Sequence, residues 1–428
     1  MAKSKTGHFS FWLGKYHVVG VSGAAARKLF LDNPQFDFVR GATLVGHGPD
    51  LVPPLHEIFH VNFQNGRTYF QRRLLDVQKS EQLEKRVPGV TKDARMIFEA
   101  LRQSASSIMN PTDTCYRLVV QQASRVVCSD EIADAPAVLA KTQSVLSLLM
   151  HTSSIHAVAL PYLPWLSKLK RRWGRYGLSK IVTPIVQRRR QKDAPRKDDM
   201  VQYMLDRGDS PEWMVNFFIS TLFISSANAG YLSGAMLNIL AHHPEWQSRI
   251  YREIAAVAEA HASNRHALLV DQLDSIPLEA WETHFPSIDL CFKEAIRMWV
   301  AFPMIRLNMA SHAVPIPGTN EVVPAGSFAA YNTTEVHFNP ELYPDPYKYD
   351  PHRFSEGREE FKKEAYGCTS NPWALVFFFF LFCCFPPSQP IHTNVPSCWV
   401  GSRPTPLSGH AVGKGSAKYH SCLCSGYV

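Results

Sequence analysis

The last 63 residues of this 428-residue chain contain no aspartate and no glutamate, although the whole chain has 37 acidic residues. A solvated surface normally carries both signs of charge, so this segment differs in kind from the rest. No internal repeat is visible, and no signal peptide or membrane anchor precedes the first apolar segment at Phe11. A composition of 45% hydrophobic and 19% charged residues excludes a wholly disordered chain, a coiled coil and a collagen-like repeat. What remains is a globular protein with ample apolar material for a core.

The acid-free segment from Tyr366 to Val428 holds six of the nine cysteines and an unbroken apolar run, Trp373–Phe385. That run has 13 residues, fewer than the roughly 20 that a membrane-spanning helix needs. A disulfide-linked module is a second interpretation, but the cysteine spacing matches no zinc pattern and nothing marks the chain as secreted. The third interpretation is translation of an intron or a shifted reading frame, which alone explains all these features together. We therefore predict a low-acid, Phe/Cys/Pro-rich, disordered tail over 368–428.

Positive charge is concentrated in one stretch. From Lys168 to Lys197 there are 12 lysines and arginines and a single acid, Asp193. A solvated pair of helices explains this pattern, and so does a surface that contacts acidic membrane lipids, because tryptophan and leucine are interspersed with the charges. Nucleic-acid binding is not expected, since no recognised fold signature accompanies the charge. A membrane-surface contact through 165–197 is thus one of the two expectations for this stretch.

Hydrophobic periodicity indicates a mainly α-helical chain with a small β subdomain. The strongest segment runs from Pro211 to Ala241, with Ser210 as a suitable N-cap and Pro211 at the first helical position. Its polar residues favour a buried central helix that lines a site over a membrane helix. After a helix at Ile288–Val300 come short β-like runs, with hairpin turns predicted at Pro317-Gly318 and Ala325-Gly326. The other predicted helices are Ser80–Gln103, Ala135–Thr152, Met200–Leu205 and Glu245–Ala262.

A carboxylate and two arginines are placed where they can converge. Glu294 and Arg297 lie three residues apart on one helix, so their side chains share a face. Alone, this spacing is equally typical of an exposed ion pair. Downstream come VHFNPELYPDP and then YDPHRF, which carries Arg353. These three features in this order resemble the cytochrome P450 family of haem-thiolate monooxygenases, over 11–367.

The resemblance implies a cytochrome P450-like fold, a haem cofactor and an oxidoreductase function on an apolar small molecule such as a sterol, a fatty acid or a secondary metabolite. It implies that Glu294, Arg297 and Arg353 form a buried triad supporting the haem-binding core, and that Arg306 contacts a haem propionate. It also implies an NADPH-dependent reductase as partner and the endoplasmic reticulum membrane as location. Because the chain shows no anchor, the cytoplasm is the alternative.

The sequence departs from the family at the iron ligand. Members ligate iron through a cysteine in a Phe-x-x-Gly-x-x-x-Cys-x-Gly loop shortly after the YDPHRF region, and the thiolate assists O–O cleavage. None of the six tail cysteines stands in such a loop, and Cys368 has Glu364 where the first glycine belongs. We therefore expect the cysteine-ligand haem loop and the N-terminal anchor to be lacking, and the metal ligand is unassigned.

A second departure lies on the central helix. The family's usual acid–threonine pair falls at Ala227 and Asn228, and alanine cannot relay a proton. The resemblance places Asn228 at the distal oxygen site as the candidate catalytic residue, although an ordinary helix-face asparagine is the alternative. Three functional hypotheses follow: a monooxygenase, a peroxide-rearranging subtype, or a catalytically dead fragment that cannot ligate haem iron through cysteine.

Overall fold

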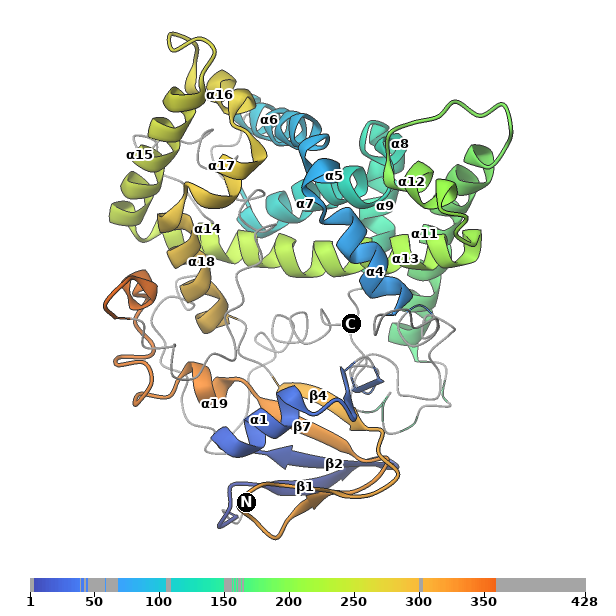
Figure 1. Cartoon of the computed structure of the whole chain (residues 1–428), viewed down its shortest axis with the longest axis vertical. Coiled ribbons are helices and arrows are strands. Elements are labelled where there is room, and N and C mark those ends of the chain that lie inside the picture. Colours follow the sequence, from blue (N-terminus) through green and yellow to red (C-terminus); the bar gives the residue numbers. More distant parts are fainter. Residues whose placement is uncertain are drawn as a thin grey trace.

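The computed structural model describes residues 4–38, 68–104, 109–149, 165–299 and 303–358, together with single positions between these ranges. Figure 1 shows a helical body above a five-stranded sheet, joined on one side by α18 (Pro286–Trp299) and the segment around α19 (Thr334–His337). The predicted class, mainly α with a small β subdomain, is confirmed. The predicted lack of an N-terminal anchor and of a haem loop falls outside the described residues.

The sheet brings together strands from both ends of the described chain. Its strand order is β1-β2-β7-β4-β3, and β2 pairs in parallel with β7, with Val18 opposite Phe328 and Val21 opposite Tyr331. Helix α1 (Ala24–Asp32) packs on the sheet through buried Phe30. The strands are β1 (Phe9–Leu13), β2 (Tyr16–Val21), β3 (Phe36–Asp37), β4 (Pro303–Asn308) and β7 (Phe328–Asn332).

Both predicted glycine turns are present, with different roles. Gly318 has φ 78° and lies between β5 (Val314–Pro315) and β6 (Val322–Val323), which pair as an antiparallel hairpin. Gly326 has φ 67°, a region of backbone conformation that glycine adopts without strain. However, the turn at Gly326 joins β6 to β7, which belong to different sheets, so it is not a hairpin turn.

The helical body packs around one large apolar core. Its helices and short helical turns are α4 (Tyr69–Val77), α5 (Ser80–Glu84), α6 (Val87–Gln103), α7 (Pro111–Val127), α8 (Asp130–Ala133), α9 (Pro136–Leu149), α11 (Leu166–Arg189), α12 (Met200–Asp206), α13 (Pro211–Ser225), η2 (Ser226–Gly230), α14 (Tyr231–Ala241), α15 (Pro244–His261), α16 (Leu269–Gln272), η3 (Leu273–Ser275) and α17 (Leu278–Thr283); a last turn, η4 (Pro351–Phe354), lies beyond α19.

Two helix predictions need correction. The segment Ser80–Gln103 is not one helix but two, α5 and α6, because Pro88 has no N–H to continue an α-helix and is accommodated in the first turn of a new one. The second correction concerns Pro111–Val127, where no helix was predicted and the structure has α7. Asn110 caps it by accepting hydrogen bonds from the backbone N–H groups of Thr112 and Asp113.

The central helix spans the predicted residues but is not uniform. It runs as α13, a π-helical turn at Ser226–Gly230, and α14. Ser210 occupies the N-cap position as predicted, but its side chain makes no capping hydrogen bond. Phe217, Phe218 and Leu222 are fully buried, so this helix forms part of the core. Single π-helical turns within α-helices are frequent at functional sites.

The basic stretch forms one long helix, α11, with Pro184 inside it. Leu166, Trp173 and Tyr176 are exposed on this helix among the positive charges. In the part of the chain that the structure describes, no helix combines the length and hydropathy needed to span a bilayer.

Candidate functional site

The three charged residues predicted to converge, Glu294, Arg297 and Arg353, lie together, the first two on α18 and the third on η4. Glu294 and Arg297 are both fully buried. Arg297 donates two hydrogen bonds to the same carboxylate, from Nε to Oε2 at 2.7 Å and from Nη2 to Oε1 at 2.7 Å. This bidentate geometry is the strongest arrangement that a guanidinium and a carboxylate can form. The alternative of an exposed ion pair is therefore wrong.

Arg353 completes the group from η4, in a part of the chain that follows α18 by more than fifty residues. Its Nε lies 3.4 Å from Glu294 Oε1, and its side chain is 2% exposed. The backbone N–H of Asp350 donates to Glu294 Oε1 at 3.1 Å. Arg353 Nη2 also donates to the carbonyl oxygen of Asp345 at 2.9 Å. The backbone of Asp345 has a positive φ of 50°. The arginine thus holds a left-handed turn of the YPDP segment against α18.

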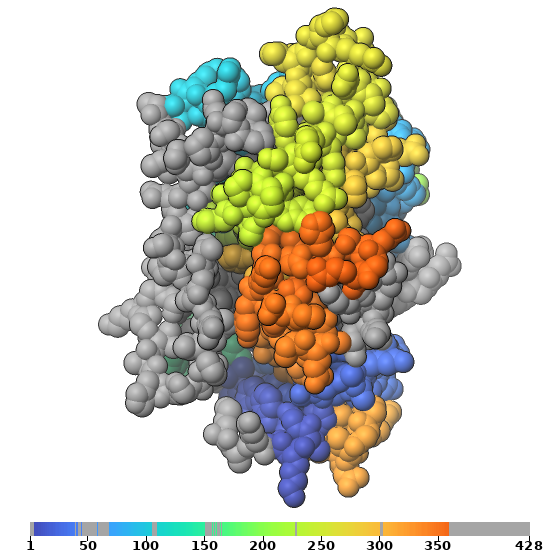
Figure 2. Space-filling model, turned by 90° about the vertical axis from the view of Figure 1, so that its left-hand side faces the viewer, coloured from blue at the N-terminus to red at the C-terminus, as the bar shows by residue number. Residues whose placement is uncertain are grey.

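Arg297 also reaches toward α19. Its Nη1 donates to the carbonyl oxygen of His337 at 2.7 Å, and its guanidinium lies 5.1 Å from the ring centre of Tyr343. In Figure 2 the segment after α19, in deep orange, lies between yellow-green α15 and the blue amino-terminal strands. Glu294, Arg297 and Arg353 thus tie α18 to this segment; we call these three residues the α18 cluster.

His337 is a buried group of the same region that sequence reasoning missed. It is 2% exposed, and neither ring nitrogen has a hydrogen-bond partner. Burial, and then the nearby charge of Arg297, lower its pKa to about 4. The imidazole is therefore neutral at physiological pH. The histidine in VHFNP was the available signal, but its burial depends on how α19 packs.

Arg306 lies on β4, away from the α18 cluster. Its Nη1 donates to the carbonyl oxygen of Leu31 at 2.9 Å, and its guanidinium packs over the Phe30 ring at 5.3 Å. Its Nε is buried without a hydrogen-bond partner, and burial lowers its pKa. A buried guanidinium with an unused donor suits an anionic group such as a propionate.

Asn228 lies within the π-helical turn Ser226–Gly230. The orientation of its side chain is outside what the structure describes. The neighbouring backbone is tightly packed, because a Cβ at Gly234 would lie 2.6 Å from Thr112 Cα of α7. The hydroxyl groups of Thr221 and Ser226 donate to carbonyls of their own helix, at 2.8 Å and 2.6 Å. These two hydroxyl groups therefore use their hydrogen atoms within the helix.

The described residues offer no thiolate for iron. Cys115, Cys128 and Cys291 are all buried, and burial raises the pKa of each thiol, that of Cys291 to about 12. Each of the three is buried in the manner of an inert structural cysteine, and we assign none of them as the iron ligand. In the described ranges there is also no cluster of three or more His, Cys, Asp or Glu suited to a metal ion. Residues 359–428, with the other six cysteines, are outside the description.

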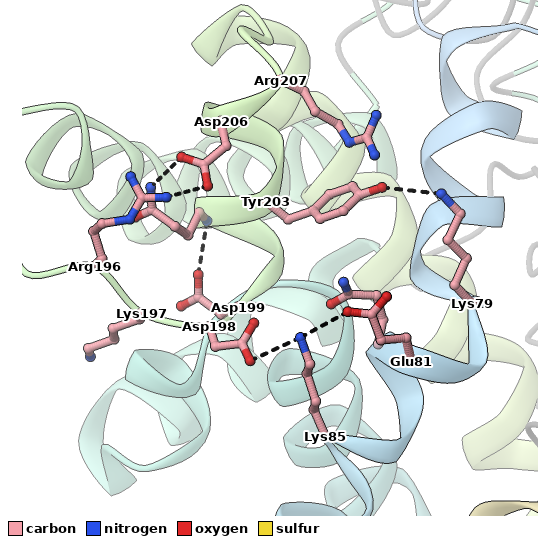
Figure 3. A pocket seen from close by; sticks show the side chains of 12 residues that line it. Lys79, Glu81, Lys85, Arg196, Lys197, Asp198, Asp199, Tyr203, Asp206 and Arg207 are labelled. Atoms are coloured by element: carbon pink, nitrogen blue, oxygen red, sulfur yellow. Dashed lines mark hydrogen bonds and ion pairs between the residues drawn. The ribbon is translucent and has the colours of Figure 1, made fainter.

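A polar cleft of about 540 Å³ opens between α5 and α12 (Figure 3). Its charges are paired with one another: Lys85 lies 3.3 Å from Asp198, and Arg196 lies 2.5 Å from Asp206. An apolar substrate would gain little from such walls. We therefore do not place the active site there.

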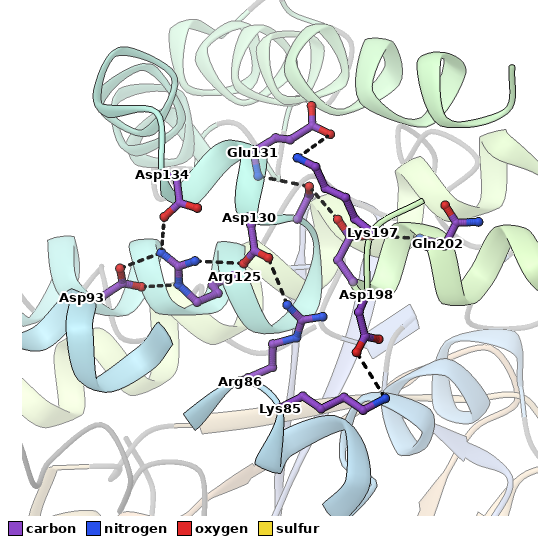
Figure 4. A network of polar contacts seen from close by, with 12 residues as sticks. Lys85, Arg86, Asp93, Arg125, Asp130, Glu131, Asp134, Lys197, Asp198 and Gln202 are labelled. Atoms are coloured by element: carbon purple, nitrogen blue, oxygen red, sulfur yellow. Dashed lines mark hydrogen bonds and ion pairs between the residues drawn. The ribbon is translucent and has the colours of Figure 1, made fainter. Parts of the chain in front are cut away.

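A second buried group of charges, which we call the α7 network, was not predicted (Figure 4). Arg125 of α7 binds Asp93 of α6 through Nε and Nη2, both at 2.8 Å. Arg125 also binds Asp130 at 2.9 Å and Asp134 at 2.6 Å, which fixes the start of α8 and of α9. Asp130 and Asp134 follow Arg125 by five and nine residues, and Asp93 precedes it by 32. None of these spacings is a motif, so no signal short of the fold identifies the network.

Known proteins share both sequence and fold with this chain. The family model of cytochrome P450 matches residues 1–368. Cytochrome P450 monooxygenase AacuE of Aspergillus aculeatus is 85% identical over 388 residues, which cover 88% of this chain and 77% of that protein. Cytochrome P450 monooxygenase dmxR5 of a Cryptosporiopsis species is 45% identical over 384 residues, covering 87% and 74%.

A solved structure is similar in fold alone. The cyanobacterial protein CYP120A1, with retinoic acid bound, superposes with a TM-score of 0.64 at 17% identity. The alignment covers 88% of this chain and 83% of that chain. The helical body and small sheet therefore have the arrangement seen in that protein.

Proposed function

This chain belongs to the cytochrome P450 monooxygenases, a family of haem-dependent oxidoreductases, and we propose that its substrate is an apolar small molecule of the secondary-metabolite kind. One observation carries the assignment of the site. The α18 cluster is buried, and within it Arg297 binds Glu294 through two parallel hydrogen bonds. Such a cluster fixes two segments rigidly, and a rigid scaffold is what a cofactor site requires.

Haem, when bound, would supply the oxygen-activating chemistry. The described residues fit part of its site: Arg306, with its buried unpartnered Nε, would hold a propionate. The α18 cluster would hold the supporting backbone in place. Asn228 would face the distal side from the π-helical turn. These roles are proposals that rest on the family resemblance and on the contacts given above. The iron ligand is not among the described residues.

We also propose the partners and location. A monooxygenase needs electrons, so an NADPH-dependent reductase is the expected partner. The exposed apolar residues of α11, Leu166, Trp173 and Tyr176, lie among its positive charges and support contact between 165–197 and an acidic membrane surface. The endoplasmic reticulum membrane is the proposed location, with the cytoplasm as the alternative.

The domain division is likewise a proposal: a cytochrome P450-like domain over 11–367, and a tail over 368–428 of different origin. The family match ends at residue 368, which supports this boundary. Translating the genomic DNA beyond Gly367 in all three frames tests it. A Phe-x-x-Gly-x-x-x-Cys-x-Gly loop in one frame is expected, and its absence from all of them would refute the frame-shift explanation.

The rival function is a catalytically dead protein that cannot ligate haem iron through cysteine. The carbon monoxide difference spectrum of the reduced full chain, purified with added haem, separates the two. A thiolate-type band supports the monooxygenase, and absence of haem uptake supports the rival. Haem uptake without that band indicates histidine or water as ligand. Asn228→Ala then tests the peroxide-rearranging alternative, which predicts turnover of an organic peroxide without reductase and its loss in this variant.

A further inference from the structure

Two arginines on α11 point toward the central helix. Arg171 is buried, donates from Nη1 to the carbonyl of Leu149 at 2.7 Å, and lies over the Phe223 ring at 5.7 Å. Arg175, one turn later, donates from Nη2 to the side-chain oxygen of Asn216 at 3.1 Å. The two guanidinium groups therefore lie at the contact between α11 and α13, on the inner face of an otherwise exposed basic helix.

The hydrogen bonding of Arg175 is incomplete. Its Nη1 is buried and has no hydrogen-bond partner, and its acceptor on α13 is a neutral amide. Burial lowers the pKa of Arg175, with no carboxylate contributing to the shift. Taking a guanidinium out of water costs several kcal/mol unless a counter-charge or good hydrogen bonds offset it. An amide oxygen on one nitrogen offsets only a part.

Three buried arginines of this chain are paired with carboxylates, whereas buried Arg27 and Arg171 donate to neutral oxygens. Arg125 binds Asp93, Arg189 binds Asp199 at 3.0 Å, and Arg297 binds Glu294. In each case the protein itself provides the carboxylate. Arg175 departs from this pattern, because its amide partner leaves the positive charge uncompensated. A half-buried guanidinium with a spare donor is what an anionic ligand recognises.

The position of the pair relates it to the proposed substrate site. Phe223, against which Arg171 packs, precedes the π-helical turn Ser226–Gly230 by one helical turn. Leu149, whose carbonyl Arg171 binds, is the last residue of α9. Arg171 therefore lies near the start of the segment that carries Asn228, whereas Arg175, at Asn216, lies about 15 Å before that turn along the helix.

We propose that Arg175, assisted by Arg171, binds an anionic group of the substrate, a carboxylate or a phenolate on an otherwise apolar molecule. This inference makes the proposed function more specific. That the bound anion is a substrate rests on the proposed function, whereas the binding of an anion does not. Arg175 Nη1 donates to the anion, and the charge of Arg171 contributes to the local positive potential. The substrate class then narrows from any apolar compound to apolar acids, which excludes neutral sterols.

The test compares two probes with the same apolar chain, decanoate and decan-1-ol, by calorimetric titration of the purified full chain at about pH 8. A charge-assisted hydrogen bond in a buried site predicts that decanoate binds at least about tenfold more tightly than the alcohol. Arg175→Gln is expected to remove this preference while leaving the affinity for decan-1-ol unchanged, which also shows that the variant is folded. Arg175→Lys restores a charge without the fork and is expected to recover part of the preference.

Arg172→Gln is the matched control, because Arg172 is exposed on the same helix. It should keep the full preference for decanoate. An equal loss in Arg172→Gln would mean that the basic surface merely attracts anions, and would overturn the proposal. So would the absence of any preference, or of measurable decanoate binding, in the unaltered chain. None of these titrations depends on turnover, so a failed carbon monoxide spectrum would refute the proposed function without deciding this inference.

Discussion

The two buried charge clusters of this protein are built in opposite ways. In the α18 cluster one carboxylate serves two arginines, and the side chains are at most 2% exposed. In the α7 network one arginine serves three carboxylates, and the side chain of Asp134 is 53% exposed. Water can therefore compensate a lost partner at Asp134 of the second cluster but not at Glu294 of the first. A sealed cluster should behave as a single unit, and a partly solvated one as a set of separate contacts.

The largest effect is expected from Glu294→Gln. The substitution keeps the volume but leaves Arg297 and Arg353 buried without a negative charge. Removing one partner of a buried pair costs about 3–5 kcal/mol, so the free energy of unfolding in urea should fall by that amount. Glu341→Gln is the control, since Glu341 is exposed. A loss below about 1 kcal/mol for Glu294→Gln would mean that the cluster does not support the fold.

Arg125→Gln should cost less, and its cost should depend on pH. It leaves Asp93 buried, and burial already raises the pKa of that carboxyl. Without Arg125 the pKa of Asp93 rises further. At a pH above that pKa the folded state must bury a charged carboxylate, which costs stability, whereas at a lower pH the carboxyl is neutral and this cost disappears. We expect a loss of about 3 kcal/mol at pH 8 and a smaller loss at pH 5. Arg102→Gln, at an exposed ion pair, should change stability by under about 0.5 kcal/mol at both values. A loss that is equal at the two values would contradict this account of Asp93.

The smallest of the three effects concerns His337, beside the α18 cluster. Its pKa is about 4 in the folded chain, against about 6.5 in an unfolded one. As pH falls below about 6.5 the unfolded chain takes up a proton that the folded chain does not, so stability is lost until pH reaches the folded pKa. Between pH 7 and 5, His337→Leu should lose about 2 kcal/mol less stability than the unaltered chain. His266→Gln, at an exposed histidine, should follow the unaltered chain. Parallel curves for His337→Leu and the unaltered chain would show that His337 titrates normally.

The same comparison explains what could be predicted from the sequence. Glu294 and Arg297 share a helix, and Arg353 follows in a recognisable motif, so local spacing indicated their meeting. The N–H of Asp350 and the burial of His337 depend on the path of the chain between these motifs, which no residue pattern encodes. The α7 network was missed together with α7 itself, because 13 of the 17 residues of that helix are buried. Several of these buried residues are polar, among them Gln121, Gln122 and Arg125, so polarity does not mark the exposed side of this helix.

The parallel pairing of β2 with β7 sets a condition on biosynthesis. Residues 18–21 leave the ribosome some three hundred residues before residues 328–331, with which they pair. Until then the side of β2 opposite β1 has no native neighbour, and its backbone N–H and C=O groups are available to other chains. Contacts of such long sequence separation form slowly. In a nascent chain, the side of β2 that pairs with β7 therefore stays unpaired until the intervening residues have been translated.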